Sequence, residues 1–369
     1  MKKKIFFIAP SLAGGLGRII VYLLRYLDRS KFELSVVVLD SRNDYKELVP
    51  SDVKIIFLDK KGRFDFFRLI LSLSRIIKIE NPFTIFAFST YINYLSVLAK
   101  MLSISKIPLF LSERNNLLIS LKNERFTFIK KIIIRNLYPK ANAIIAPSEG
   151  VKRDLIVNFG IKEKKCKLIY NGTDLDNIKI LSMEPVDHPW FKENIPVIVA
   201  CGRLSKQKNY PMLLKSIEII KEKQSARLLI LGDGEERSKL ESLVRKFGIR
   251  DKIDFLGFQK TPFKFIAKAT LFVLTSLWEG FPNVLVEAMA CGVPVISTNC
   301  PSGADEIITN GINGMIIPVN NEKALSEAIM RLLKNNSLRK RLAEEGRKRA
   351  EDFRIEKMVA EYEQIIESL

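Results

Sequence analysis

Histidine is almost absent from this chain of 369 residues, which holds a single one, His188. The scarcity argues against a metal centre or an acid–base pair built on histidine. His188 stands beside Pro189 and Trp190 in a stretch with little regular pattern, where we expect a surface position.

Cysteine and long apolar runs are scarce as well. The four cysteines show no metal-ligand spacing and suit reduced thiols in a cytosolic protein. No run of 18 uncharged apolar residues is present, so the sequence predicts no transmembrane helix. The apolar run at residues 5–9 is too short for a secretion signal and is expected to be a buried strand. We therefore expect a cytoplasmic protein.

Positive charge is abundant and unevenly spread. The formal net charge is +19, and residues 1–180 hold 32 Lys and Arg against 16 Asp and Glu. This half is expected to meet an anionic partner, either a nucleic acid or an anionic membrane face. Residues 117–137 mix apolar and cationic side chains, as in a helix that lies on the inner face of the plasma membrane or one that only covers a sheet.

Two halves of the chain each alternate apolar strands with helices, which predicts an α/β protein with two parallel sheets. The length also suits two domains. The last helix has no strand of its own to cover, so we expect it to pack back on the first domain. The predicted boundaries are 1–175 with 355–369 for the first domain, 176–195 for a linker and 196–354 for the second domain.

A turn with a carboxylate on each side, at residues 279–287, is the most informative stretch. An apolar strand precedes it and a small-residue helix follows it. Gly280 and Pro282 keep side chains out of the space before that helix, whose N-terminus suits a phosphate. The N–H groups expected to point at the ligand are those of Asn283, Val284 and Leu285.

The two carboxylates of this turn, Glu279 and Glu287, are placed to accept hydrogen bonds from hydroxyl groups on either side of a phosphate. That order of hydroxyl, diphosphate and hydroxyl is the order of a sugar nucleotide. A plainer interpretation is that both are charges favoured near a helix start. Two cations support the first interpretation, because Arg203 and Lys208 flank a glycine turn after strand 197–201 and would neutralise a diphosphate leaving group.

Three further turns follow predicted strands and carry candidate binding residues. Gly14 and Gly15 are candidate donor-binding residues, because they let backbone approach a diphosphate or an acceptor closely, or they form a plain tight turn. Arg114 and Asn115 are placed to face a phosphate or an acceptor hydroxyl, or to cap a helix. The backbone near Phe258 is placed to hold a nucleobase.

These motifs resemble those of the retaining family-4 glycosyltransferases. The resemblance rests on Gly202-Arg203-Leu204 with Lys208, on Glu279-Gly280-Phe281-Pro282 and on the run from Glu287 to Val295. It implies the GT-B fold, with two Rossmann-like domains facing a central cleft, the second binding the donor and the first the acceptor. By resemblance, Arg203 and Lys208 hold the diphosphate, Glu279 the sugar and Glu287 the ribose. The implied lining of the donor pocket is Gly280, Phe281, Asn283, Val284 and Leu285.

The chain departs from that family in one respect, since many members place a histidine in the first domain near the donor sugar and this chain has none there. The run Ser112-Glu113-Arg114-Asn115 is similar to a subgroup that builds bacterial surface glycans and lipid-linked oligosaccharides. The resemblance therefore implies a polyprenyl-diphosphate-linked or other glycan acceptor.

The resulting prediction is a metal-independent, retaining hexosyltransferase that moves a hexose or N-acetylhexosamine from a UDP-sugar, with no cofactor and no nucleic acid partner. Arg203, Lys208 and Glu279 are its predicted catalytic residues. No Asp-x-Asp pair stands where the donor diphosphate is expected, so the two cations take the place of a metal. The alternatives are an inverting transferase, a sugar-nucleotide epimerase, or a basic α/β protein that binds nucleic acid without catalysis.

Overall fold

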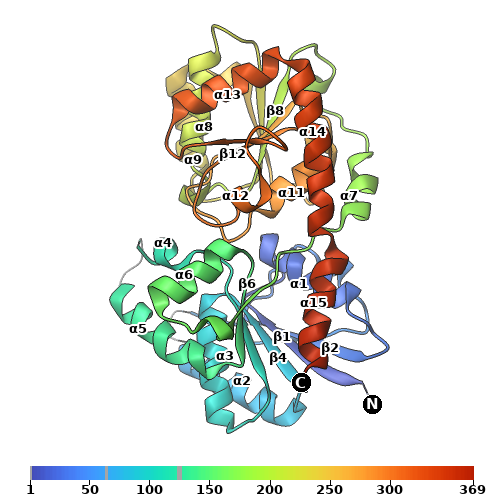
Figure 1. Ribbon diagram of the computed structural model, residues 1–369, viewed down its shortest axis with the longest axis vertical. Coiled ribbons are helices and arrows are strands. Elements are labelled where there is room, and N and C mark those ends of the chain that lie inside the picture. The colour runs from blue at the N-terminus through green and yellow to red at the C-terminus, as the bar shows by residue number, and fades with distance from the viewer. Residues whose placement is uncertain (1, 63–64, 123–126) are drawn as a thin grey trace. The chain divides into compact units, whose positions relative to one another are not determined.

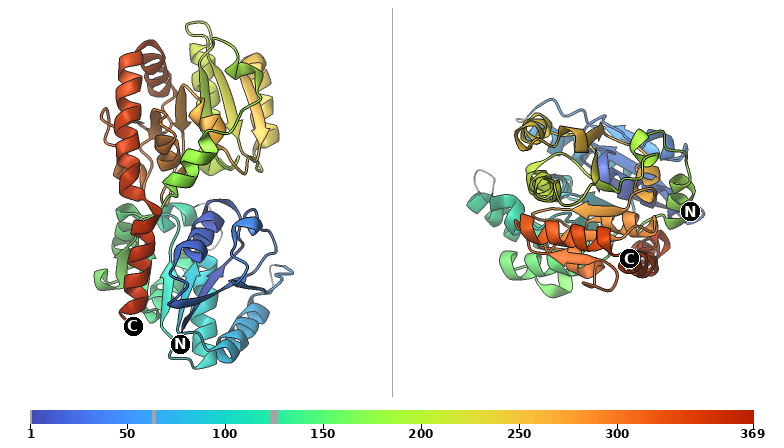
Figure 2. Two further views of the ribbon diagram at one scale, coloured as in Figure 1. Left: turned by 90° about the vertical axis from the view of Figure 1, so that its right-hand side faces the viewer. Right: turned by 90° about the horizontal axis from the view of Figure 1, so that it is seen from above.

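The computed structural model describes residues 2–62, 65–122 and 127–369, and the chain forms two compact units (Figure 1). Unit 1 comprises Met1–Gly172 and Ile355–Leu369, and unit 2 comprises Thr173–Arg354. In each unit, helices flank a central sheet (Figure 2). No described helix combines the length and the apolar character that a membrane-spanning segment needs.

The sheet of unit 1 is parallel throughout, with the strand order β3-β2-β1-β4-β5-β6-β7. The order reverses at β1, because β2 and β4 lie on its two sides. The strands are β1 (Lys3–Ala9), β2 (Phe32–Val38), β3 (Lys54–Phe57), β4 (Thr84–Phe88), β5 (Leu109–Ser112), β6 (Ala143–Ala146) and β7 (Cys166–Leu168).

Two hydrophobic layers cover the two faces of this sheet. One face carries α1 (Gly14–Tyr26) and α15 (Ile355–Glu367). The other face carries five helices, whose buried residues form a separate cluster. They are α2 (Phe66–Glu80), α3 (Thr90–Ser103), α4 (Leu117–Lys122), α5 (Thr127–Leu137) and α6 (Glu149–Phe159).

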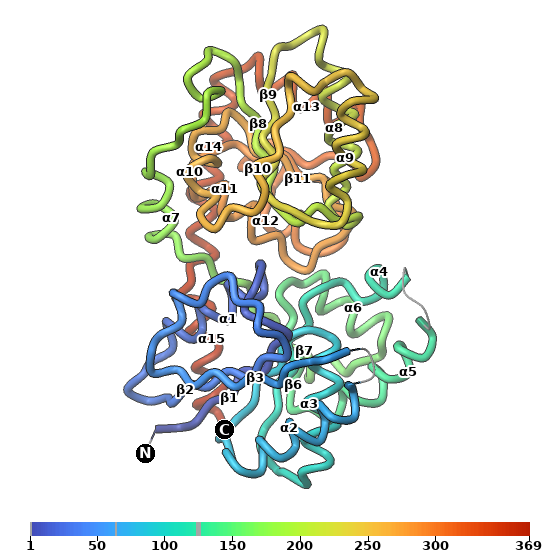
Figure 3. Tube along the Cα trace, turned by 180° about the vertical axis from the view of Figure 1, so that it is seen from behind, coloured from blue at the N-terminus to red at the C-terminus, as the bar shows by residue number. Residues whose placement is uncertain are grey.

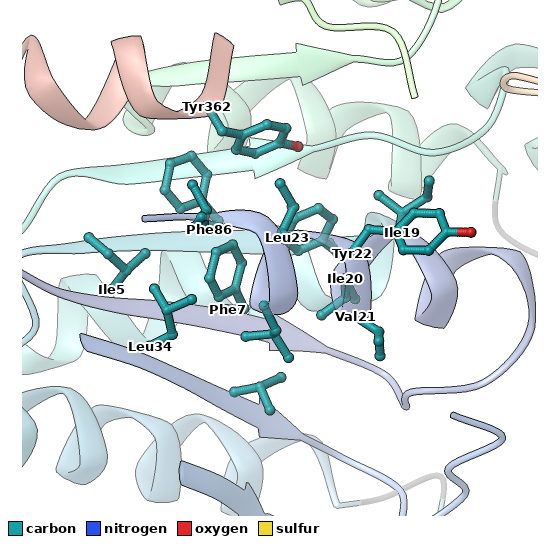
Figure 4. Close-up of a cluster of buried hydrophobic side chains, with 14 of the residues drawn as sticks. Ile5, Phe7, Ile19, Ile20, Val21, Tyr22, Leu23, Leu34, Phe86 and Tyr362 are labelled. Carbon is teal, nitrogen blue, oxygen red and sulfur yellow. The ribbon is translucent and has the colours of Figure 1, made fainter. Parts of the chain in front are cut away.

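Aromatic rings fill the core between the sheet and α15. Phe7 of β1 stacks on Phe86 of β4 with ring centroids 5.7 Å apart, and the fully buried Tyr362 of α15 lies 5.3 Å from the same Phe86 (Figure 4). Successive strand residues point to opposite faces, which explains why Phe6 belongs to the other cluster. The last helix is thus part of the core of unit 1.

The sheet of unit 2 is also parallel, with the order β10-β9-β8-β11-β12-β13. Its strands are β8 (Val197–Cys201), β9 (Arg227–Leu231), β10 (Ile253–Gly257), β11 (Leu271–Leu274), β12 (Val295–Thr298) and β13 (Met315–Ile317). Its helices are α7 (Leu175–Ser182), α8 (Tyr210–Ile220), α9 (Arg237–Phe247), α10 (Phe263–Ala267), α11 (Asn283–Ala290), α12 (Ala304–Ile307), α13 (Glu322–Lys334) and α14 (Asn336–Ala350).

The chain passes between the two units twice, at residues 172–173 and 354–355 (Figure 3). The two passages are neighbours. Thr173 donates its N–H to the carbonyl of Phe353 at 2.8 Å, and a β-carbon added at Gly172 would lie 2.7 Å from the α-carbon of Ile355. Gly172 therefore has to be a glycine for the second passage to lie against the first.

Three expectations about local structure are wrong or incomplete. The stretch 176–195 is not wholly irregular, because α7 (Leu175–Ser182) covers its first part, capped by the Asp174 side chain that accepts from Asn177 N–H. The amphipathic segment 117–137 forms two helices, α4 and α5, and residues 123–126 lie outside the described part. His188 is buried, with its Nε2 3.2 Å from Asp254 Oδ2 and its Nδ1 accepting the N–H of Trp190.

Candidate functional site

The order of strands in unit 2 reverses at β8, which has β9 on one side and β11 on the other. In parallel α/β sheets, ligands bind at such a switch point, outside the carboxyl ends of the strands. The loop after β8 carries Arg203 and Lys208, and the loop after β11 carries Glu279. The topology therefore brings all three predicted catalytic residues to one edge of the sheet.

Lys208 and Glu279 form a close ion pair, with Lys208 Nζ 2.6 Å from Glu279 Oε1. The exposed fractions of the two side chains are only 16% and 9%. The hydroxyl of Ser276 donates to the same oxygen at 2.6 Å, and Gln207 Nε2 lies 3.4 Å from the other oxygen. A lysine ammonium has three N–H donors, so this pair leaves it able to bind further oxygen atoms.

The loop after β8 is fixed by close backbone packing against the loop after β9. A β-carbon on Gly232 would lie 2.0 Å from the carbonyl oxygen of Gly202, and one on Gly234 would lie 2.4 Å from that of Leu204. The buried hydroxyl of Tyr210 donates to the Gly202 carbonyl at 3.0 Å. Burial raises the pKa of Tyr210 well above its usual value, so this hydroxyl stays a neutral donor.

Arg203 differs from Lys208 in its exposure. Its side chain is 73% exposed and forms an ion pair with Glu235, Nη2 to Oε2, at 3.0 Å. An ion pair so exposed is worth little in water. The guanidinium can therefore exchange this carboxylate for an oxygen of a ligand at small cost.

The turn before α11 is more closed than the sequence suggests. Asn283 donates its N–H to the carbonyl of Phe281, and Leu285 donates to that of Pro282, each at 2.9 Å. The prediction that both N–H groups face a phosphate is therefore wrong in this structure, because the turn satisfies them itself. The ring of Phe281 packs edge-to-face on Phe353, with centroids 5.3 Å apart.

Of the remaining donor-side candidates of unit 2, Glu287 lies on α11, the helix that follows β11, and Phe258 comes directly after β10. Glu287 sits on α11 with an exposed fraction of 7%. Phe258 is 51% exposed and follows Gly257, whose carbonyl accepts the N–H of Gly232 at 2.7 Å. This bond links the end of β10 to the same glycine that packs against the loop after β8.

In unit 1, the two glycines after β1 border open space. A β-carbon at Gly14 or Gly15 would meet no atom within 4 Å, whereas one at Gly17 would lie 2.3 Å from the carbonyl carbon of Leu12. Gly14 donates its N–H to Asp44 Oδ2 at 3.0 Å. Gly17 is thus required for packing, while the space around the first two glycines is available to a ligand.

Arg114 and Asn115 follow β5 at the same edge of the unit 1 sheet. The half-buried Arg114 guanidinium donates from Nη2 to Asn171 Oδ1 at 2.7 Å, and Asn115 is exposed. The turn is held by Glu113, a fully buried carboxylate that accepts from the Tyr138 hydroxyl at 2.6 Å and from Arg114 N–H at 2.9 Å. Burial raises the pKa of Glu113.

Sequence reasoning missed the residues that hold the candidate ones. Gln207 and Ser276 around Glu279 are not singled out at all, whereas Glu235 beside Arg203, and Glu113 and Asn171 around Arg114, stand in motifs of the sequence that assign them no supporting role. A sequence signal for Gln207 is its place between two lysines of the same turn. Within the described residues, no group of three or more His, Cys, Asp or Glu side chains is arranged to hold a metal ion.

Two Rossmann-like units with parallel sheets are the architecture of the GT-B fold. The chain belongs to glycosyltransferase family 4. The family model described as Glycosyltransferase Family 4 matches residues 13–177, and that described as Glycosyl transferases group 1 matches residues 187–349. The protein is therefore a hexosyltransferase, and the epimerase and the non-enzymatic alternatives are excluded.

Relatives and solved structures agree with this assignment. N-acetylgalactosamine-N,N'-diacetylbacillosaminyl-diphospho-undecaprenol 4-alpha-N-acetylgalactosaminyltransferase of Campylobacter jejuni is 30% identical over 360 residues, 96% of each chain. A second Campylobacter jejuni relative, GalNAc-alpha-(1->4)-GalNAc-alpha-(1->3)-diNAcBac-PP-undecaprenol alpha-1,4-N-acetyl-D-galactosaminyltransferase, is 28% identical over 379 residues, 99% of this chain and 98% of its own. The crystal structure of Anabaena HepE with UDP and glucose matches with a TM-score of 0.83 and 21% identity, over 100% of both chains, and shows the same fold.

Proposed function

We propose that this protein is a retaining glycosyltransferase that moves a hexose or N-acetylhexosamine from a UDP-sugar to a lipid-linked glycan acceptor in surface polysaccharide synthesis. The observation that carries the proposal is the partly buried Lys208–Glu279 pair at the switch point of unit 2. The closeness of the two charges supports a site in which the cation meets a leaving diphosphate and the carboxylate meets sugar hydroxyls.

On the donor side, Lys208 and Arg203 neutralise the diphosphate as the bond to the sugar breaks. Glu279 orients the sugar through its hydroxyls and Glu287 accepts from the ribose. Val284 N–H at the start of α11 completes the phosphate contacts, with Gly280, Phe281, Asn283 and Leu285 shaping the pocket. The backbone beside Phe258 receives the base.

On the acceptor side, unit 1 offers open space at Gly14 and Gly15 and polar groups at Arg114 and Asn115. A cation there suits the diphosphate of a lipid-linked glycan. The names of the two Campylobacter jejuni relatives, which specify undecaprenol-linked glycans, support this class of acceptor.

The proposed transfer needs no metal and no protein base. An oxygen of the leaving diphosphate takes the proton of the acceptor hydroxyl as that hydroxyl attacks on the same face of the sugar, so the anomeric configuration is retained. Lys208 stabilises the charge that develops on that diphosphate. His188 takes no part, since its ring is engaged with Asp254 and Trp190.

The test has two arms. A thermal-shift panel of UDP, GDP, ADP and CMP, with and without EDTA, should give stabilisation by UDP that survives EDTA. Stabilisation by another nucleotide and not by UDP would overturn the assignment of a UDP-sugar as donor. A thermal shift with UDP that disappears when EDTA is added would overturn the proposal that no metal is needed. NMR of the glycoside product then reads the anomeric configuration, and inversion relative to the donor sugar would overturn the retaining mechanism.

A further inference from the structure

Arg114 is a half-buried cation whose bonding partners are neutral. Its guanidinium donates from Nη2 to Asn171 Oδ1 at 2.7 Å and from Nη1 to the Ser112 hydroxyl at 3.4 Å. In the part of the chain that the structure describes, no carboxylate forms an ion pair with it. Burial lowers the pKa of Arg114 from its usual value, as expected for a cation without a paired anion. Charges taken out of water are normally paired, so the guanidinium is available to an anionic ligand.

The neighbouring carboxyl group of Glu113 is engaged elsewhere. Its Oε1 accepts the Thr90 hydroxyl and the Arg114 N–H, each at 2.9 Å. Its Oε2 accepts the Tyr138 hydroxyl at 2.6 Å. Both lone pairs of Oε1 are therefore in use. Glu113 binds the backbone of Arg114 and does not pair with its guanidinium.

Glu113 also joins the turn after β5 to the turn after β4. Thr90 is the first residue of α3, and Ser89 before it has a φ of 84° and a ψ of 151°. Residues other than glycine rarely adopt this conformation, which persists only where the surroundings hold it. Ser89 N–H donates to the Ser112 carbonyl at 3.0 Å, and the Thr90–Glu113 bond is a second tie. The two turns thus form one fixed unit at the carboxyl edge of the sheet.

A second buried carboxyl group holds the far end of the Arg114 turn. Asp154 of α6 is 3% exposed, and its Oδ2 accepts the N–H groups of Leu117 and Leu118 at 2.7 and 3.1 Å. The segment 113–118 is therefore fixed at both ends. The backbone that carries Arg114 cannot shift without breaking bonds to one of the two carboxyl groups.

We propose that Glu113 and Thr90 are positioning residues, which hold the Arg114 turn so that its guanidinium meets the diphosphate of the acceptor. The inference rests on the proposed function, in which Arg114 binds that diphosphate. A guanidinium recognises a phosphate through paired N–H groups in a fixed geometry, so a small displacement of the turn lowers the affinity. Thr90 acts at one remove, because its hydroxyl orients the carboxyl group that binds Arg114 N–H.

The test uses inorganic diphosphate as the probe and the full chain saturated with UDP, so that the proposed donor site is occupied. Calorimetry measures the affinity for diphosphate. Arg114→Met should weaken binding at least about tenfold, because a cation is removed. Thr90→Val keeps the shape but removes the hydroxyl, and should weaken binding about five- to tenfold. Thr90→Ser keeps the hydroxyl and should bind within about twofold of the unchanged chain.

Thr90 is the residue to change because it is only partly buried, whereas Glu113 lies fully inside unit 1. Combining Thr90→Val with Arg114→Met separates positioning from a direct contact. If Thr90 acts through Arg114, the double variant should bind diphosphate as weakly as Arg114→Met alone, within about twofold. A further loss equal to that of Thr90→Val alone would overturn the proposal. So would unchanged affinity in Thr90→Val, or a loss in Thr90→Ser as large as that in Thr90→Val.

The matched control is Thr84→Val, at the opposite end of β4. The Thr84 hydroxyl donates to the Pro108 carbonyl at 3.1 Å, so it also ties β4 to the chain beside β5, but at the amino edge of the sheet. The same carbonyl still accepts the N–H of Ile85 in this variant. The affinity for diphosphate should not change, and a loss equal to that of Thr90→Val would overturn the proposal.

The nucleotide thermal shift keeps this proposal apart from the assignment of the donor. A chain that shows the UDP shift but binds no diphosphate beyond it overturns the positioning of Arg114 and leaves the donor intact. A chain without the UDP shift overturns the proposed donor. The Thr90 and Arg114 variants, titrated with diphosphate alone, then still decide the positioning.

Discussion

Lys208 Nζ lies 2.6 Å from Glu279 Oε1, although 71 residues separate the two in the chain. Because Ser276 also donates to that carboxylate oxygen, the charge of Glu279 is compensated from two sides. A buried ion pair of this kind stabilises little by itself, but removing one partner leaves an uncompensated charge. The proposed role of the pair in donor binding therefore rests on its position at the switch point of unit 2 and not on a gain in stability.

Replacing Lys208 by alanine should lower turnover by about 10²–10³-fold, because the leaving diphosphate loses a cation. Lys206→Ala is the matched control, since Lys206 is an exposed lysine of the same turn. Single-turnover rates of both variants with a UDP-sugar measure the effect. Activity of Lys208→Ala within about threefold of the unchanged enzyme would contradict the assignment.

Gly232→Ala should destabilise unit 2 by more than about 2 kcal/mol. Its β-carbon would lie 2.0 Å from the Gly202 carbonyl oxygen, and its φ is +143°. Gly311→Ala is the control, because Gly311 also has a positive φ of 76° but meets no atom within 4 Å. That change should cost about 1–2 kcal/mol. Urea unfolding of the two variants provides the comparison, and equal losses would refute the packing argument.

Tyr362→Ala should destabilise unit 1 by about 3–5 kcal/mol. The ring is fully buried against Phe86, and nothing on the sheet can replace it. Gln364→Ala, at an exposed position of the same helix, should change the free energy of unfolding by less than about 0.5 kcal/mol. A thermal unfolding scan in which both variants behave alike would show that α15 is not part of the core.

Glu113 should make the stability of unit 1 depend on pH. Burial raises its pKa in the folded state above the ordinary 4.5, so folding favours the protonated carboxyl group. The stability that this group contributes is present at low pH and is lost as the pH rises through the folded-state pKa.

Comparison with Glu113→Gln isolates this effect, because the amide does not titrate. The free energy of unfolding of the unchanged chain minus that of the variant should be larger at about pH 5 than at about pH 8. Urea titrations at the two pH values measure it. A difference that grows with pH would mean that the hydrogen-bond donors around Glu113 lower its pKa by more than burial raises it.

Much of the fold follows from local sequence signals. The alternation of apolar strands and helices predicts both parallel sheets, and glycine turns after the strands predict where Arg203, Lys208 and Glu279 lie. These signals are short-range, and the physics behind them is the periodicity of buried side chains. The amphipathic last helix is likewise visible from its spacing alone.

The rest depends on partners that are distant in the chain. His188 looks like a surface residue until Asp254, 66 residues away, is placed beside it. The closure of the turn at Asn283 depends on how the Phe281 carbonyl is oriented, which composition does not specify. Glu113 looks like one of several polar residues until burial and the Tyr138 hydroxyl single it out.

Unit 1 is discontinuous in the chain, since it takes residues 355–369 after the whole of unit 2. During synthesis, domains fold as they emerge from the ribosome, starting from the N-terminus. Here the order of completion is inverted, because the core of unit 1 lacks Tyr362 until its last segment has been translated. While unit 2 is being translated, the ring of Phe86 lacks the Tyr362 ring that covers it in the folded unit. During this interval the sheet exposes apolar surface, which is the kind of surface that leads to aggregation and that chaperones protect.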